Sequence, residues 1–301
     1  MPMNPKPYKL KFYNLETKNG VLALGGSTCI MGILNVTPDS FSDGGRYFSL
    51  DAALERARQL IADGADILDI GGESSRPFSD PVSEAEELRR VIPVIEHLAG
   101  NLDVPISIDT TKATVARRAL EAGAAMINDI SALRFDPDMA EVAADTGAPV
   151  VLMHMLGSPK DMQVDPSYDD LLGEIHQFLE RAVLDAEKAG ISREKIIIDP
   201  GIGFGKTVRH NLELIRRLEW FSDLDVPILA GPSRKAFIRK LLAGKNQVEN
   251  EADASHDMVE TGTMAAVCAT ILNGAHIVRV HDVARTRAAA TIADAVKNAQ
   301  Q

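Results

Sequence analysis

The sequence predicts an α/β protein built as a (β/α)8 TIM barrel, and three features point to this fold. Eight short apolar runs alternate with stretches of helical periodicity, the pattern of a parallel sheet covered by helices. Each run ends in a polar residue or cluster, as expected where the carboxyl ends of barrel strands surround one crevice. With 301 residues, 45% of them hydrophobic, the chain can bury a large core. An open doubly wound sheet is the rival fold, but eight repeats are enough to close a barrel.

The runs and their polar ends define the strands in chain order. The polar ends are Asn35, residues 71–76 (GGESSR), Asp109, Asn128-Asp129, His154, Asp199, Ser233-Arg234-Lys235, and Arg279 with His281. Before the first run, residues 8–12 alternate in polarity, and Asn19-Gly20, a type I′ turn dipeptide, precedes VLAL. We therefore predict one domain, in which a hairpin within residues 1–28 plugs the bottom of a barrel formed by residues 29–301.

Caps and apolar stripes predict the helices. The second begins at Ser83, which forms a capping box with Glu86, and the fifth has a helical stripe from Leu171 to Val183. Further helices are predicted at 51–63, 112–122, 138–146, 209–218, 255–272 and 283–298, and a charged surface loop is predicted at 244–253. The loops Val36–Leu50 and Gly71–Val82 exceed the usual length, and we expect them to act as lids over the crevice.

Composition limits the partners of the protein. The net charge of -11 and the pI near 5.1 argue against general binding to nucleic acid or to anionic membranes. No apolar stretch reaches the roughly 20 residues of a membrane span, and no signal peptide is evident. We therefore predict a soluble cytoplasmic protein, in which Cys29 and Cys268 are reduced thiols.

The segment 199–207 (DPGIGFGKT) is rich in glycine but does not match a nucleotide-binding loop. A P-loop needs glycine where Pro200 stands, and a dinucleotide motif needs glycine where Lys206 stands. The glycines are predicted to let the backbone approach a ligand, with Phe204 as a flat apolar wall. Zinc-ligand spacings and a G-x-S-x-G elbow are absent from the sequence. Lys235 could form a Schiff base, but nothing around it requires one.

The polar strand ends predict either a salt-bridge network or a ligand site. Asp109, Asn128, Asp199 and Lys235 would together suit a heterocycle rich in N–H donors, such as a 2-amino-pyrimidinone ring. Arg279 and His281 follow the last strand, where barrels often bind phosphate, and Asn35 and Arg76 could approach from the first two strands.

Seven segments resemble the dihydropteroate synthase family and occur in its order. They are MGILNVTPDSFSDGG (31–45), DIGGESSRP (69–77), SIDT (107–110), INDIS (127–131), DPGIGFGK (199–206), GPSRK (231–235) and RVHDV (279–283). The first loop motif and the SRK segment are highly specific. The resemblance implies a transferase of folate biosynthesis that condenses 6-hydroxymethyl-7,8-dihydropterin pyrophosphate with p-aminobenzoate. The products would be 7,8-dihydropteroate and pyrophosphate, formed by SN1-like loss of Mg²⁺-pyrophosphate.

The same resemblance implies the roles of individual residues. The pterin would be held by Asp109, Asn128, Asp199 and Lys235, in a slot lined by Met153 and Ile130. The pyrophosphate would be bound by Asn35, Ser75, Arg76, Arg279 and His281, with Mg²⁺ on Asn35 and Asp43. The aminobenzoate pocket would be made by Ser75, Pro77, Phe204 and Lys235. Lys235, Arg279, His281 and Asp43 are expected to be catalytic.

The chain departs from the family pattern at three positions, where Ser75, Phe78 and Ala236 stand in place of threonine, glycine and serine. The last two leave the shape of the aminobenzoate pocket and the response to sulfonamides open. The family implies a homodimer through the last helices, whose small-residue face includes Gly262, Ala266 and Ala269. The alternative functions are a pterin-binding methyltransferase domain and a non-catalytic pterin-binding paralogue.

Overall fold

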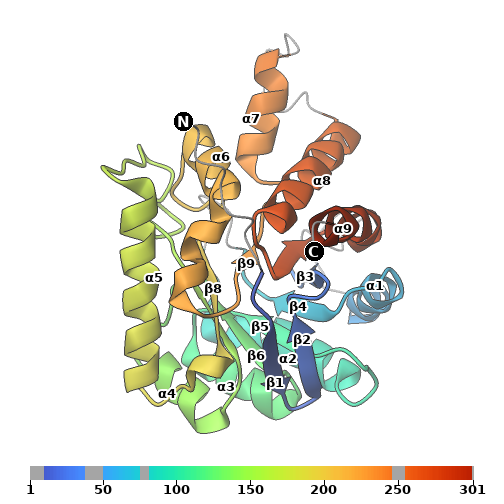
Figure 1. Ribbon diagram of the computed structural model, residues 1–301. Helices are drawn as coiled ribbons and strands as arrows, with labels where there is room; N and C mark the ends of the chain where they lie inside the picture. The colour runs from blue at the N-terminus through green and yellow to red at the C-terminus, as the bar shows by residue number, and fades with distance from the viewer. Residues whose placement is uncertain (1–9, 38–49, 75–80, 246–254, 300–301) are drawn as a thin grey trace.

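Eight parallel strands form a barrel, as predicted, in a computed structural model that describes residues 10–37, 50–74, 81–245 and 255–299 (Figure 1). The strands are β3 (Cys29–Asn35), β4 (Ile67–Gly71), β5 (Ile106–Asp109), β6 (Met126–Asp129), β7 (Val150–Met153), β8 (Ile196–Asp199), β9 (Leu229–Ala230) and β10 (Ile277–Val280). The sheet order is β8-β7-β6-β5-β4-β3-β10-β9. Closure occurs just before β9, where Ile198 and Ile228 form a parallel bridge and the Ile198 amide donates to the Pro227 carbonyl at 3.0 Å.

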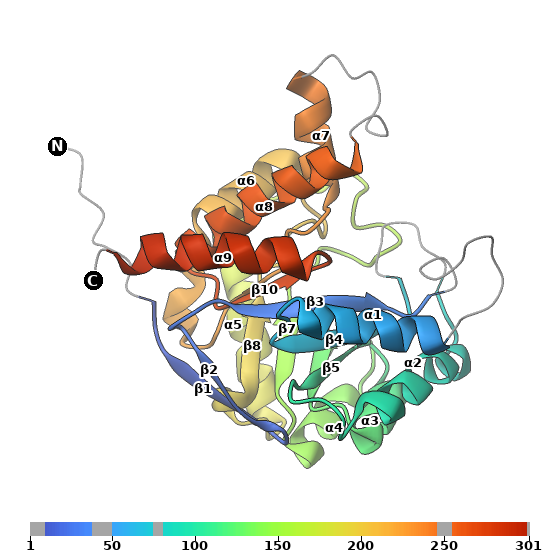
Figure 2. The same cartoon turned by 90° about the vertical axis from the view of Figure 1, so that its right-hand side faces the viewer.

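Helices cover the outside of the barrel (Figure 2). They are α1 (Leu50–Ala62), α2 (Glu84–Leu98), α3 (Ala113–Ala122), α4 (Met139–Thr146), α5 (Leu171–Lys188), α6 (Val208–Arg216), α7 (Ala236–Lys245), α8 (His256–Leu272) and α9 (Val283–Asn298), with 3-10 helices η2 (Arg193–Lys195) and η3 (Leu218–Leu224). Half of the predicted capping box of α2 is formed, because the Ser83 hydroxyl accepts from the Glu86 amide at 3.3 Å, whereas the Glu86 carboxylate accepts from Arg89 and Arg90. Each predicted helix corresponds to one of these elements within a few residues.

Helix α7 was not predicted from the sequence. It begins directly after Lys235 and continues through Gly244 to Lys245, so the predicted loop over 244–253 begins in a helix. The rest of that loop lies outside the described residues. Figures 1 and 2 both place α7 beyond α6 and α8, away from the barrel. Two helices therefore follow β9, where the repeat predicts one.

The N-terminal hairpin is formed by β1 (Tyr13–Thr17) and β2 (Gly20–Leu24), and the prediction of its first strand was too early. Pairing begins only at Tyr13, and the turn residues are Lys18 and Asn19 because Thr17 pairs with Gly20. Leu15 and Leu24 are fully buried. They pack against side chains inside the amino-terminal end of the barrel, so the hairpin is the predicted plug.

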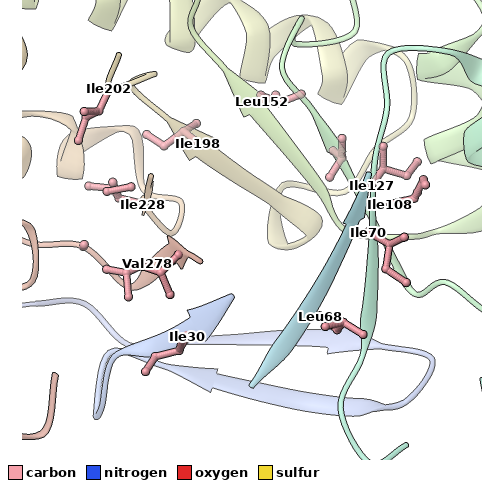
Figure 3. Packing of buried hydrophobic residues seen from close by; sticks show 14 of the residues in the cluster. Ile30, Leu68, Ile70, Ile108, Ile127, Leu152, Ile198, Ile202, Ile228 and Val278 are labelled. Carbon is pink, nitrogen blue, oxygen red and sulfur yellow. The ribbon is translucent and has the colours of Figure 1, made fainter. Parts of the chain in front are cut away.

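Side chains of the strands alternate between two apolar layers. The inner layer, which meets the hairpin, contains Cys29, Met31, Ile67, Met126, Val151, Ile197, Leu229 and Ile277. The outer layer packs under the helices, and Figure 3 shows part of it on successive strands, from Ile30 and Val278 round to Ile198. Because both faces are buried, the strands are almost continuously hydrophobic.

Two further expectations concern the surroundings of the fold. Cys29 is buried and Cys268 half-buried, and both are free thiols, as predicted. Within the described ranges, no helix has the length and hydropathy that a membrane crossing requires. The central parts of the two long loops, residues 38–49 and 75–80, lie outside the described residues, so their function as lids remains a prediction.

Truncation of the plug should destabilise the barrel. Leu15→Ala should lower the free energy of unfolding by about 2–4 kcal/mol, because it leaves a cavity in a closed apolar cluster. Val21→Ala on the same hairpin, where the side chain is 60% exposed, should lower it by less than about 0.5 kcal/mol. Denaturant titration followed by circular dichroism measures both, and equal losses would show that the hairpin does not complete the core.

Candidate functional site

The strand register brings the predicted polar residues to one level at the carboxyl end of the barrel. Asn35 pairs with Gly71, Gly71 with Asp109, and Asp109 with Asn128. On the far side of the ring, Met153 pairs with Asp199. Residues that are distant in sequence therefore share one rim.

An ion-pair network lies at the centre of this rim. The Arg279 guanidinium donates from Nε to Asp69 Oδ2 at 2.6 Å and from Nη2 to Asp109 Oδ2. Asn128 Nδ2 donates to the same Asp69 oxygen at 3.1 Å. Arg279 thus joins β4, β5 and β10, and Asn128 joins β6 to the network through Asp69. Of the four residues for which the sequence left a salt-bridge network open, Asp109 and Asn128 take part in this one, through Arg279 and Asp69 respectively.

Asp69 was missed in the sequence, although it is the most buried acid of the network. Its side chain is 0% exposed, and among the described residues its Oδ1 atom has no hydrogen-bond partner. The signal was a charge in the middle of the apolar run DILDI, inside a strand expected to be buried on both faces. Burial raises the pKa of the neighbouring Asp109 carboxyl, the Arg279 charge opposes this rise, and Asp69 adds to it.

Lys235 follows β9, the strand next to β10, and lies against Phe204. Its Nζ atom is 3.7 Å from the centre of the Phe204 ring, a cation–π arrangement. Burial lowers the pKa of Lys235 to about 7, and the charge of Arg279 acts in the same direction. Gly203 has φ +86°, and a Cβ atom there would lie 2.6 Å from Lys235 Cδ. The glycine thus makes room for the lysine side chain.

Asp199 ends β8 as a buried carboxylate. Its Oδ1 atom accepts from the Gly201 amide at 2.7 Å. Burial raises the pKa of Asp199 to about 6, although the Gly201 hydrogen bond and the charges of Lys235 and Lys206 lower it. Asp199 thus lies on the same rim as Lys235, and its carboxylate is oriented by a hydrogen bond from the backbone of Gly201.

Two buried residues, His154 and Lys206, support the segment 199–207 that follows β8, and the sequence indicated no role for either. Lys206 Nζ donates to His154 Nδ1 and to the Phe204 carbonyl, both at 2.9 Å. Burial lowers the pKa of His154 to about 2, with the Lys206 charge as the next cause, so the imidazole is neutral. Burial also lowers the pKa of Lys206 to about 7. In the sequence, the only indication that these two residues belong to the site was the position of His154 at a strand end.

His281 follows β10 and lies beside Ser233. The Ser233 hydroxyl and His281 Nδ1 are 2.9 Å apart, and the His281 amide donates to the same hydroxyl at 3.2 Å. Ser233 therefore fixes the orientation of the imidazole, a role that the sequence did not indicate.

An apolar wall flanks the polar rim. It consists of Met153, Met155, Met162 and Phe204, with Ile130 packed against them. The structure thus brings together Met153 and Ile130, predicted for the pterin slot, and Phe204, predicted for the aminobenzoate pocket. A cleft of about 300 Å³ meets the site at Asp109 and Ile130, and most of its lining lies beside the site, around Glu73, Lys112 and Ser158.

Some predicted site residues cannot be located. Asp43, Ser75, Arg76 and Pro77 lie outside the described residues, as does Phe78. Asn35 is half-buried at the end of β3. In the ranges that the structure describes, no three His, Cys, Asp or Glu side chains converge as a metal site.

Comparison with known proteins agrees with this geometry. The sequence model of a family described as pterin binding enzyme matches residues 31–281. The dihydropteroate synthase of Synechocystis sp. is 48% identical over 272 residues, which cover 90% of this chain and 91% of the relative. That of Bacillus subtilis is 48% identical over 284 residues, 94% of each chain. The chain belongs to the dihydropteroate synthase family.

Solved structures of the family share the fold. Xanthomonas albilineans dihydropteroate synthase with 4-aminobenzoic acid has a TM-score of 0.85 at 44% identity, covering 95% of this chain and 99% of that one. The same enzyme in complex with 7,8-dihydropteroate has a TM-score of 0.79 at 44% identity, covering 91% and 96%. Like the other members of the family, this chain is a transferase.

Asp199 should make the stability of the enzyme depend on pH. Its folded pKa of about 6 lies above the ordinary value of about 3.9, so the penalty for ionisation is absent below about pH 4 and complete above about pH 6. Asp199→Asn should remove this penalty. The gain in unfolding free energy should grow with pH and reach roughly 1–3 kcal/mol at about pH 7.5.

Thermal denaturation without substrate at about pH 4.5 and 7.5 measures this gain. The matched control is Asp225→Asn, which removes an exposed carboxylate paired with Lys11. That ion pair lowers the pKa of Asp225, so its loss cannot stabilise the protein at neutral pH. A pH-independent effect of Asp199→Asn would rule out the ionisation penalty.

Proposed function

We propose that the enzyme condenses 6-hydroxymethyl-7,8-dihydropterin pyrophosphate with p-aminobenzoate, giving 7,8-dihydropteroate and pyrophosphate. The observation that carries this proposal is a rim of buried acids, an amide and cations beside a wall of methionine and phenylalanine. Support also comes from relatives whose structures contain 4-aminobenzoic acid and 7,8-dihydropteroate.

The pterin ring is proposed to lie between the apolar wall and the acids. Asp199 can accept two parallel N–H bonds from a 2-amino-pyrimidinone edge, because a carboxylate has two oxygens in one plane. Asn128 can both donate and accept, and Lys235 can donate to the ring carbonyl or a ring nitrogen. Met153 and Phe204 supply flat contact with the ring, since both are part of the wall.

The diphosphate is proposed to lie nearer Arg279 and His281. Two of the five N–H donors of Arg279 serve Asp69 and Asp109, and the others can be offered to phosphate oxygens. Because two carboxylates hold the guanidinium, it need not reorganise when the leaving group acquires charge. The family resemblance adds Asn35, together with Ser75 and Arg76, to this anion site.

Mg²⁺ is proposed to bind the diphosphate, held by Asn35 and Asp43. The fit rests on donor type, since an amide and a carboxylate are both oxygen ligands, and Mg²⁺ usually combines one or two such groups with substrate phosphates. Asn35 is half-buried at the rim, where its amide can face an anion. When bound, the ion would neutralise charge on the departing diphosphate.

We propose that the C–O bond breaks before the amine attacks. Positive charge on the methylene carbon can be delocalised into the electron-rich pterin, which Asp199 stabilises by holding its N–H edge. Arg279 and His281 stabilise the negative charge that collects on the leaving group. The aryl amine then needs little activation, and Ser75, Pro77, Phe204 and Lys235 would hold it. The two long loops would exclude water from the cation.

The proposal extends to inhibitors and assembly. Sulfonamides resemble p-aminobenzoate, and a Yersinia pestis relative has been solved with a sulfonamide drug complex. Phe78 and Ala236 would then alter the shape of the pocket that such drugs enter.

A homodimer through α8 and α9 in the cytoplasm is the proposed assembly, supported by exposed Ile292 and Val296.

Gly262 does not support that dimer in the way predicted from the sequence. A Cβ atom on Gly262 would lie 2.7 Å from Ile238 Cγ2 of α7. The small residue therefore serves packing within the chain, and the exposed apolar side chains of α9 are the better evidence.

Loss of the central arginine tests the anion site. Arg279→Ala should reduce kcat for dihydropteroate formation by about 10²–10³-fold, the effect of losing one transition-state donor. The control is Arg287→Ala, which removes an arginine paired with Asp66 at the other end of the barrel. Steady-state kinetics on folded protein measures both. Near-normal turnover of Arg279→Ala would exclude it from the reaction, and a wild-type enzyme that forms no product would indicate the non-catalytic alternative.

Removal of the metal should stop the reaction. Treatment with EDTA should abolish dihydropteroate formation, and added Mg²⁺ should restore it. Asn35→Ala should raise the Mg²⁺ concentration for half-maximal activity by about 10-fold or more, as expected for a lost metal-site contact. An unchanged Mg²⁺ requirement in that variant would remove Asn35 from the proposed metal site.

A further inference from the structure

Arg234 is the residue of the Ser233-Arg234-Lys235 segment to which the proposed reaction gives no role. It occupies the third position of a turn in which the Lys235 amide donates to the Pro232 carbonyl at 3.3 Å. Its φ is +58°, in the left-handed region. Glycine or asparagine is usual at this position of such turns, because a larger residue there costs roughly 1–2 kcal/mol. Something outside the turn must therefore hold the arginine in place.

Helix α8 makes two contacts with Arg234 from residues one turn apart. Arg234 Nε donates to Glu260 Oε1, and the Arg234 amide donates to Thr263 Oγ1 at 3.2 Å. Glu260 is 1% exposed, and the Nε2 atom of His256 lies 3.6 Å from the Oε1 atom that Arg234 contacts. A buried carboxylate persists only where it is paired, so Arg234 and Glu260 depend on each other.

The turn orients two groups of the site, one on each side of Arg234. Ser233 precedes it and bonds to His281 at 2.9 Å. Lys235 follows it and lies over Phe204, with its aliphatic chain against Gly203. A change in the φ of Arg234 would rotate Lys235 relative to Ser233, which would misplace one of the two groups.

We propose that Arg234 and Glu260 are a positioning pair, in which α8 holds the strained turn so that Ser233 and Lys235 face the site together. Neither side chain of the pair touches substrate. The inference rests on the proposed function, because it concerns the same reaction. Through Glu260, helix α8 would thus affect turnover indirectly, by positioning the turn that carries Ser233 and Lys235.

Three variants and a control test the pair. Glu260→Gln should lower kcat by about 10–100-fold, the scale of a misplaced catalytic group, with less change in KM for aminobenzoate. Arg234→Gly should keep kcat within about 5-fold of wild type, because glycine adopts positive φ unaided, but should lower Tm by leaving Glu260 unpaired. The double variant Arg234→Gly/Glu260→Gln should restore both kcat and most of the lost Tm.

The control is Asp257→Asn, which breaks an exposed ion pair between α8 and Arg285 of α9 and should leave kcat unchanged. Normal turnover of Glu260→Gln would overturn the pair, and so would loss of turnover in the double variant, since that would mean that Arg234 itself acts on substrate. If Glu260→Gln does not fold, the kcat of the double variant alone tests the positioning pair. A wild-type enzyme without product would instead overturn the proposed function, which separates the two failures.

Discussion

The site depends on one buried cation. Arg279 lies between Asp69 and Asp109, two acids on neighbouring strands that are almost excluded from water. Without this positive charge, burial and the charge of Asp69 would raise the pKa of Asp109 further. Because Arg279 comes from β10 and the acids from β4 and β5, the same contact also holds three strands in register at the rim. The site and the alignment of these strands at the rim therefore depend on the same interaction.

The two ends of the barrel have opposite physical characters. The amino-terminal end is filled by hydrocarbon, with Leu15 and Leu24 of the hairpin against the inner side chains of the strands. The carboxyl-terminal end holds acids and lysines whose pKa values are shifted by burial, such as Asp199 and Lys235. Apolar packing at one end stabilises a chain that carries an electrostatic penalty at the other, as is common where a site needs desolvated charges.

Sequence periodicity predicted most of the fold but not its exceptions. Strand ends and helix caps, such as Ser83, are local signals, so the order of elements and the rim residues followed from them. Helix α7 was missed because the repeat predicts one helix after each strand, and β1 was placed too early because alternation alone does not mark where pairing begins. Asp69 and Lys206 were overlooked as site residues because their importance lies in burial, which is a property of the whole fold.

By itself the sequence determined that this chain forms an eight-stranded barrel with acids, amides and cations at one end, since period, caps and strand ends are set by neighbours along the chain. Only the tertiary structure decided which of these groups meet. In the folded chain, Arg279 pairs with Asp69 and Asp109. Lys235 lies over Phe204, and Glu260 of α8 pairs with Arg234. Such partners are far apart in sequence, and their contacts depend on strand register and helix packing, which no local pattern contains.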